Sequence, residues 1–124
     1  MNSKVFLVLR ILFGLFLLFF GLNKFFDFIV FVPETENAVN YLEALEVTKT
    51  MHMVAILEII AGLSLLVNKF GALLMVILMS ISINAVLYHT TLEPSTITGS
   101  LILIIFNIIM LYGYKNQYKN ILRA

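Results

Sequence analysis

The chain has 124 residues, of which 61% are hydrophobic and only 12% are charged, and its mean hydropathy is +1.03. Soluble globular domains have about 45–50% apolar and about 25% charged residues, so this composition excludes a water-soluble domain and predicts a chain embedded in a lipid bilayer. A net charge of +1 excludes nucleic acid as a partner, and the absence of cysteine excludes thiolate catalysis, disulfide exchange and iron–sulfur ligation.

The first apolar segment covers residues 5–32, and Arg10 is its only charged residue before Leu22. Because a spanning helix needs about 20 residues, this segment is long enough to cross a bilayer with some tilt. A secretory signal peptide is the alternative, but Arg10 interrupts the apolar region and no small-residue cleavage pattern follows. We therefore expect a retained transmembrane helix.

The longest polar segment, residues 33–50, follows this span. Pro33 is typical of a helix start, and Glu34 and Glu36 favour the positive end of a helix dipole. Apolar residues then recur at helical spacing, namely Ala38, Tyr41, Leu42 and Leu45. This pattern predicts a short amphipathic helix that lies at the membrane interface.

Three more apolar segments follow, at residues 51–67, 71–88 and 97–114. The connections between them are short, and the sequence shows no soluble domain, internal repeat or low-complexity linker. The predicted fold class is therefore all-α, an integral membrane four-helix bundle with a short interfacial amphipathic helix between the first and second spans. Residues 1–124 are expected to form a single transmembrane domain.

The charged residues are distributed unevenly about these spans. One side of the predicted bundle carries only basic residues, namely Lys4, Lys69, Lys115, Lys119 and Arg123. The opposite side carries Lys49 together with the acidic residues Glu34, Glu36, Glu43, Glu46 and Glu93. Because cytoplasmic segments next to spans carry an excess of Lys and Arg, both termini are predicted to face the cytoplasm.

Several polar residues lie inside the spans, at depths that follow from the helical rise of about 1.5 Å per residue. Asn23 and Lys24 lie about 28 Å along the first span, and Glu58 lies about 10 Å below the start of the second. Asn84 reaches a similar level in the third span, and His89 ends that span at the outer surface. We expect these five residues to gather at the outer end of the bundle as a ligand-binding set.

Lys24 and Glu58 are the charged members of this set. Because a charged side chain that faces lipid costs about 2.5–3.5 kcal/mol, both are expected to face inward and to form an ion pair. Asp27 is the alternative partner for Lys24, but it is shallow enough to reach water. Small residues that allow close helix approach share the faces of these charges, namely Gly14, Gly21, Ala55 and Gly62.

Each of these polar residues also has a purely structural interpretation. The set would then only join the helices, through hydrogen bonds worth about 0.6 kcal/mol each. His52 is predicted to be a surface residue, Arg10 to reach lipid phosphates, and Asn107 to mark the inward face of the fourth span. No metal site is expected from His52, Glu58 and His89, because the first two diverge by about 120° around their helix. Neither histidine lies deep enough to favour a haem.

The motifs along the chain resemble those of the DoxX-like membrane proteins. They occur in the family's order, as Gly21-Leu-Asn-Lys-Phe25, Ala38-Val-Asn-Tyr-Leu-Glu-Ala-Leu45, Glu58-Ile-Ile-Ala-Gly-Leu-Ser-Leu-Leu-Val-Asn68, and Asn84-Ala-Val-Leu-Tyr-His89 with Leu92-Glu-Pro94. The resemblance covers essentially the whole chain and implies a compact four-helix protein of the bacterial inner membrane. It also implies a link to redox assemblies, since some members are subunits of thiosulfate:quinone oxidoreductase and others belong to respiratory or oxidative-stress assemblies.

The residues and the resemblance together predict a polar pocket near the outer face that binds a quinone or a similar small amphiphile. Lys24 and His89 would donate hydrogen bonds to a ligand oxygen, while Glu58 would keep Lys24 charged and relay a proton. A redox partner subunit would carry any sulfur chemistry, because this chain has no cysteine. The alternatives are a non-catalytic scaffold or assembly subunit and a permease, whose polar path only Arg10 and Asn107 suggest on the cytoplasmic half.

Overall fold

The computed structural model describes residues 2–123, and all regular elements in that range are helical. The main helices are α1 (Ser3–Phe26), α2 (Glu36–Val47), α3 (Thr50–Val67), α4 (Gly71–Thr91) and α5 (Ile97–Gly113). The short elements are the 3₁₀ helices η1 (Pro94–Thr96) and η2 (Lys115–Tyr118), and the terminal helix α6 (Lys119–Leu122).

Four segments are long and apolar enough to cross a membrane, namely Ser3–Phe26, Thr50–Val67, Gly71–Thr91 and Pro94–Gly113. The chain is a multi-span integral membrane protein. The predicted all-helical fold, with four spans and an additional helix between the first and the second, is confirmed.

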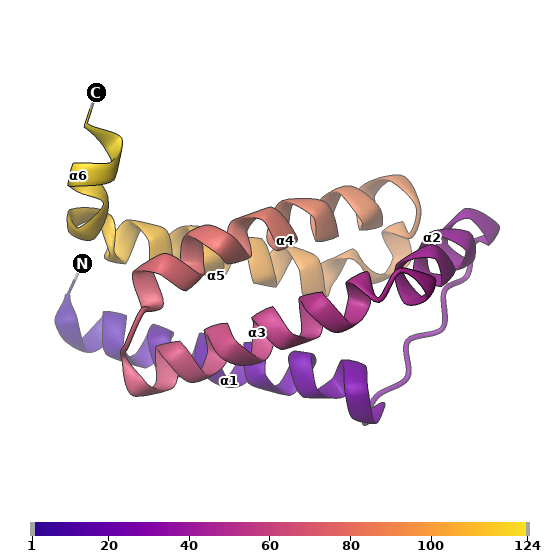
Figure 1. The fold of residues 1–124 in the computed structure, drawn as a ribbon, viewed down its shortest axis with the longest axis horizontal. Helices are drawn as coiled ribbons and strands as arrows, with labels where there is room; N and C mark the ends of the chain where they lie inside the picture. Colours follow the sequence, from indigo (N-terminus) through magenta and orange to yellow (C-terminus); the bar gives the residue numbers. More distant parts are fainter. Residues whose placement is uncertain (1, 124) are drawn as a thin grey trace.

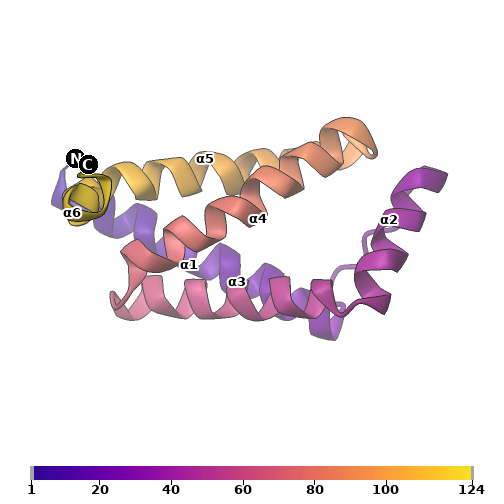
Figure 2. The ribbon, with the colours of Figure 1, turned by 45° about the horizontal axis from the view of Figure 1, so that its top comes forward.

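The spanning helices form two pairs (Figure 1). α1 packs along α3, α4 packs along α5, and α3 also contacts α4. Figure 2 shows α4 and α5 on one side of the bundle and α3 on the other, with α2 at one end. The N-terminus and the C-terminus lie at the opposite end from α2 (Figure 1).

The two ends of the bundle differ in charge. We call the end with both termini and the α3–α4 turn the basic end, because it carries Lys4, Lys69, Lys115, Lys119 and Arg123. We call the other end the acidic end, because it carries α2 and the connections that contain Glu34, Glu36, Glu43, Glu46 and Glu93. The cytoplasmic location of the basic end stays a prediction.

α1 ends at Phe26, whereas the predicted first span continues to residue 32. The helix stops there because Asp27 adopts the left-handed conformation, with φ of 51°. Asn23 then holds the chain that follows, since its Nδ2 donates to the Ile29 carbonyl at 3.0 Å and its Oδ1 accepts from the Ile29 amide at 2.7 Å. The connection to α2 therefore leaves the helix axis at this point.

Two phenylalanines of this connection fold back onto α1. Phe28 stacks on Phe19 with ring centroids 6.1 Å apart, and Phe31 stacks on Phe20 at 6.4 Å. α2 then begins directly after Thr35, whose side chain caps its first turn. The apolar stretch that extended the predicted first span thus covers the outside of α1 instead of lengthening it.

The contact between α1 and α3 depends on glycines that bring the two backbones together. A Cβ added at Gly62 would lie 2.7 Å from the Gly14 carbonyl oxygen, and one added at Gly21 would lie 3.0 Å from the Ala55 carbonyl oxygen. Neither position has room for a larger residue while the helices remain at this distance. The predicted role of these small residues in close helix packing is confirmed.

The contact between α4 and α5 contains a neutral hydrogen-bond network. Ser82 Oγ donates to Asn107 Oδ1 at 2.7 Å, and Asn107 Nδ2 donates to the Met75 carbonyl oxygen at 3.0 Å. Ser82 and Asn107 are both 0% exposed. Asn107 therefore marks the inward face of α5, as its position in the span predicts, and the surrounding core contains Phe13, Leu17, Leu65, Leu78 and Met110.

At the basic end, Tyr118 fastens η2 to the start of α4. Its hydroxyl donates to the Ala72 carbonyl oxygen at 2.7 Å. Burial, with a smaller contribution from the neighbouring Tyr114, raises the pKa of Tyr118 to about 12. The folded protein therefore favours the neutral phenol, which is the form that can donate this hydrogen bond.

Candidate functional site

An ion pair between Lys24 and Glu58 joins α1 to α3 in the half of the bundle nearer the acidic end. Lys24 Nζ lies 2.6 Å from Glu58 Oε1, and it also donates to the Phe20 carbonyl oxygen at 3.4 Å. The Glu58 side chain is 4% exposed, whereas the Lys24 side chain is 26% exposed. The predicted pair is confirmed, and Asp27, the alternative partner, lies just beyond the end of α1.

The glycines explain how two helices hold these charges so close together. Lys24 lies three residues after Gly21 on α1, and Glu58 lies four residues before Gly62 on α3. Residues three or four apart share a helix face. Each charged side chain therefore lies on the face of its helix where a glycine brings the α1 and α3 backbones close together. Burying a carboxylate costs several kcal/mol, which attraction to a nearby cation offsets in surroundings of low dielectric constant.

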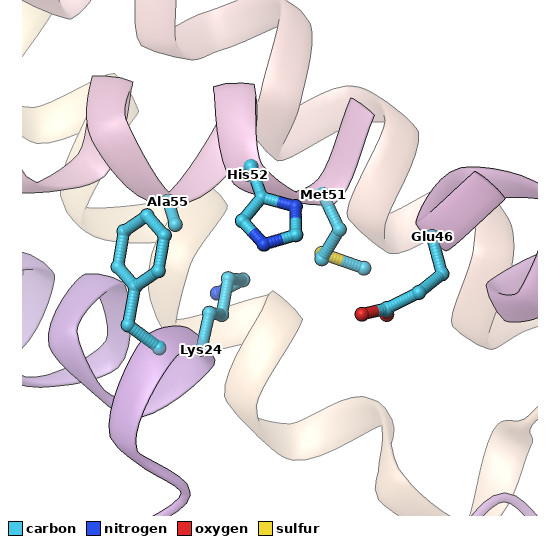
Figure 3. Close-up of a pocket in the computed structure, with 6 residues that line it drawn as sticks. Lys24, Glu46, Met51, His52 and Ala55 are labelled. Carbon is cyan, nitrogen blue, oxygen red and sulfur yellow. The ribbon is translucent and has the colours of Figure 1, made fainter. Parts of the chain in front are cut away.

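A crevice opens beside Lys24 where three helices meet (Figure 3). Its lining comes from α1, α2 and α3, and consists of Lys24, Phe25, Glu46, Met51, His52 and Ala55. The volume is about 20 Å³, which is room for about one water molecule. In Figure 3 the Glu46 carboxylate reaches in from α2, and His52 faces Lys24 from α3. The crevice therefore gives polar access to the lysine of the ion pair.

His52 is half-buried, so it is less exposed than the surface position predicted for it. Its ring lies 5.5 Å from the Phe25 ring, and its Nδ1 is buried without a hydrogen-bond partner among residues 2–123. Buried polar atoms without partners are uncommon in proteins, so His52 Nδ1 is a candidate to bond with a group that enters the crevice. The sequence position of His52 at the start of α3 does not predict this burial, because Phe25 of α1 covers part of the ring.

Three of the five predicted site residues bond outside this crevice. Asn23 is occupied with the Ile29 backbone, as described above. Asn84 Nδ2 donates to the Tyr41 hydroxyl at 2.8 Å, and this bond ties α4 to α2. The third, His89, lies at the end of α4. Within residues 2–123, no hydrogen bond of these three residues reaches the ion pair, so the structure brings only the two charged members of the set together.

His89 packs against the loop that leads to α5. Its Nδ1 lies 3.2 Å from the Glu93 carbonyl oxygen and 3.1 Å from Thr96 Oγ1. The Glu93 side chain itself is buried, and its Oε2 accepts hydrogen bonds from the backbone amides of Glu34 at 3.0 Å and Thr35 at 3.4 Å. Glu93 thus joins the loop before α5 to the connection before α2. Sequence patterns missed this role, because it depends on two loops that are far apart along the chain.

The chemistry available at the crevice is that of an ammonium group, a carboxylate and an imidazole. Within residues 2–123, no group of three or more His, Cys, Asp or Glu side chains is placed to hold a metal ion. The Lys24 ammonium can donate hydrogen bonds to a carbonyl or anionic oxygen, and His52 and Glu46 are groups that can accept or release a proton. The arrangement is therefore suited to binding an oxygen-rich polar head.

Comparison with known proteins finds a family but no individual relative. The family model for DoxX matches residues 5–90, which is more than half of the chain. These residues contain the ion pair, the crevice and all five predicted site residues. No curated protein and no solved structure matches the chain.

Proposed function

The chain belongs to the DoxX family of membrane proteins, and we propose that it binds the polar head of a small amphiphile, a quinone or a similar carbonyl compound, at the crevice beside Lys24. The observation that carries this proposal is the partly exposed Lys24 ammonium, held by a buried Glu58 at the mouth of a polar crevice. Ionisable residues inside a membrane protein mark ligand and proton paths more often than they serve packing alone.

The ligand oxygen enters the crevice, and the rest of the ligand remains outside. Space for about one water molecule is enough for a carbonyl oxygen, which accepts a hydrogen bond from Lys24. Phe25 and His52 flank the opening with rings that offer a flat contact to a quinone ring. The isoprenoid or alkyl tail then lies among the lipid chains.

Each residue of the predicted site has a role in this proposal. Lys24 donates to the ligand, and Glu58 keeps Lys24 charged and relays a proton. Asn23, Asn84 and His89 act indirectly, because they hold the connection after α1, the position of α2 and the loop after α4. The direct hydrogen bond expected from His89 is replaced by this indirect role.

The protein is proposed to act as a quinone-binding subunit of a redox complex in the bacterial inner membrane, with both termini in the cytoplasm. The electron donor then belongs to a partner subunit, since this chain has no cysteine to ligate an iron–sulfur cluster or to handle sulfur. The excess of Lys and Arg at the basic end supports the orientation. In this orientation the crevice opens towards the outer face.

Calorimetric titration of the purified protein in detergent with short-chain ubiquinone and menaquinone analogues tests the binding. We expect saturable binding to the natural chain, and affinity that is at least about tenfold lower for Glu58→Gln and for the double variant Lys24→Met/Glu58→Leu. The double variant contains no unpaired buried charge, so it keeps the fold while removing the donor. Ser82→Ala, a buried polar change in the other helix pair, is the matched control and keeps full affinity. Equal affinity in the control and the double variant would refute the site.

A membrane scaffold is the second candidate function, and one observation favours it. Lys24 and Glu58 bond to each other and thereby join α1 to α3 directly. If the protein is a scaffold, partner subunits still co-purify with the double variant from membranes in normal amounts, even though this variant binds no quinone. A loss of both quinone binding and partner recovery in this variant favours the redox role over the scaffold.

A further inference from the structure

A second cavity lies at the basic end, on the far side of the molecule from the crevice. Its volume is about 340 Å³, and it is lined by Ser3, Lys4, Phe6, Leu7, Arg10 and Asn68. This volume falls at the lower end of the range of small-molecule sites in proteins, which is about 300–1,000 Å³. The lining contains two cationic side chains and no acidic one.

Arg10 is the unusual member of this lining, because it is only 7% exposed. Its Nη1 donates to the Leu65 carbonyl oxygen on α3, which places the guanidinium between α1 and α3. A guanidinium has five N–H donors. Within residues 2–123 the Arg10 side chain makes one hydrogen bond, the bond to the Leu65 carbonyl oxygen. The remaining donors can therefore bind a group that enters the cavity.

Arg10 also has no ion-pair partner within residues 2–123. The one ion pair of these residues joins Lys24 and Glu58. All seven acidic residues of the sequence lie in the acidic half of the bundle or beyond it, with none near Arg10. A buried cation without a carboxylate partner is costly unless an anion approaches it. Lys4 lies six residues, or about 1.7 turns, earlier on α1 and points about 120° away from Arg10 around the helix. Its long side chain nevertheless lines the same cavity and adds a second positive charge there.

From this cavity we infer that the basic end holds a site for a phosphate group, which Arg10 and Lys4 bind together. Guanidinium groups bind phosphate oxygens through two parallel hydrogen bonds, and a lysine adds a point charge. Arg10 lies about 10 Å along α1 from Ser3, so its side chain reaches back towards the depth at which lipid headgroups lie. Phe6 and Leu7 give the cavity an apolar wall that suits the glycerol or acyl part of a phospholipid. A phosphatidylglycerol headgroup and free inorganic phosphate share the chemistry that the site recognises.

Native mass spectrometry tests the lipid as the source of the phosphate. The purified protein in detergent is mixed with phosphatidylglycerol or with phosphatidylcholine, and the bound lipid is counted. We expect phosphatidylglycerol to be retained, and its affinity to fall about fivefold in Lys4→Gln and at least as much in Arg10→Gln. Lys119→Gln removes an exposed charge at the same end outside the cavity, so it is the matched control and keeps normal retention.

A parallel calorimetric titration with inorganic phosphate tests the soluble source. Phosphate binding that Lys4→Gln weakens, with no preference for phosphatidylglycerol, assigns the site to a soluble phosphate ion. Lipid retention that falls equally in Lys4→Gln and Lys119→Gln would show attraction to the whole basic end and would overturn the site. Because the Lys4 side chain is exposed and has no hydrogen bond or ion pair within residues 2–123, a failure of Arg10→Gln to fold leaves the Lys4 comparison intact.

Discussion

The Lys24–Glu58 ion pair of one helix pair and the Ser82–Asn107 network of the other differ in kind. Between α4 and α5, Ser82 and Asn107 are neutral, fully buried and bonded to groups of the same pair. Between α1 and α3, Lys24 and Glu58 are charged, and the lysine remains partly open to a crevice. The groups of the Ser82–Asn107 contact bond within their own helix pair, whereas the Lys24 ammonium can donate a further hydrogen bond to a group in the crevice.

This difference separates a structural role from the proposed binding role. A neutral network with all partners satisfied holds helices together at a modest cost of burial. An ion pair costs more to bury, and its replacement by apolar residues is often neutral or even stabilising. An open ion pair is therefore a poor choice for holding helices together, and its exposed side favours a ligand. The contrast can be tested by breaking each contact in turn.

The largest expected effect is that of removing the carboxylate alone. Glu58→Leu leaves Lys24 between the helices without its counter-charge, and we expect it to lower the free energy of unfolding by about 2–3 kcal/mol. This is less than the loss of about 3–5 kcal/mol for a fully buried pair, because Lys24 is partly exposed. Unfolding by SDS titration measures the loss. Adding Lys24→Met should restore most of the stability, and a double variant as unstable as Glu58→Leu would contradict the comparison.

The next effect concerns the close approach that brings the two charges together. Gly62→Ala places a Cβ against the Gly14 carbonyl oxygen, and we expect overpacking to cost about 1–3 kcal/mol in the same titration. The matched control is Gly99→Ala, because a Cβ at Gly99 meets no atom within 4 Å. The control should show no loss of stability. Alanine has the higher helix propensity at both positions, so an equal loss at both would contradict a specific effect of the α1–α3 contact.

A smaller effect is expected at the neutral contact. Asn107→Leu removes the hydrogen bonds to Ser82 and to the Met75 carbonyl, and we expect a loss of about 0.6–1.7 kcal/mol. Quinone binding should remain unchanged, since this contact lies in the other helix pair. Reduced quinone affinity in Asn107→Leu, at equal stability, would remove the distinction between the two contacts.

The smallest effect lies outside both contacts, at Tyr118. The pKa of Tyr118 is raised from about 10 to about 12, so its contribution to stability is present below pH 10 and is lost as the pH rises towards 12. The thermal unfolding temperature of the natural chain should therefore fall more steeply over this interval than that of Tyr118→Phe. Parallel curves for the two chains would show that burial does not raise the pKa of Tyr118 in the folded protein.

The features that the sequence predicts are those set by spacing along one helix. The four spans follow from apolar length, and the Lys24–Glu58 pair follows from the high cost of placing either charge in lipid. The close approach at Gly14 and Gly62 follows from small residues on the same face.

The features that the sequence does not predict depend on how the connections fold. The predicted first span runs past the end of α1 because residues 28–32 are apolar. The helix ends at the left-handed Asp27, and the bonds of Asn23 to Ile29 turn the apolar chain away from the helix axis. The burial of His52 and the contribution of Glu46 to the crevice depend on the position of α2, which no periodicity sets. Asn84 and His89 share a depth with the ion pair, but depth does not fix the direction in which a side chain points.

The bonds between the two loops at the acidic end limit how the crevice can widen. Glu93 accepts the amides of Glu34 and Thr35, and the Thr35 hydroxyl donates to the Leu92 carbonyl at 2.7 Å. These bonds fix the start of α2, the helix that brings Glu46 to the crevice. The wall of the crevice is thus tethered to the hairpin at the opposite side of the bundle. Entry of a bulky ring then requires that the loops before α2 and before α5 shift together, or that the hydrogen bonds between them break.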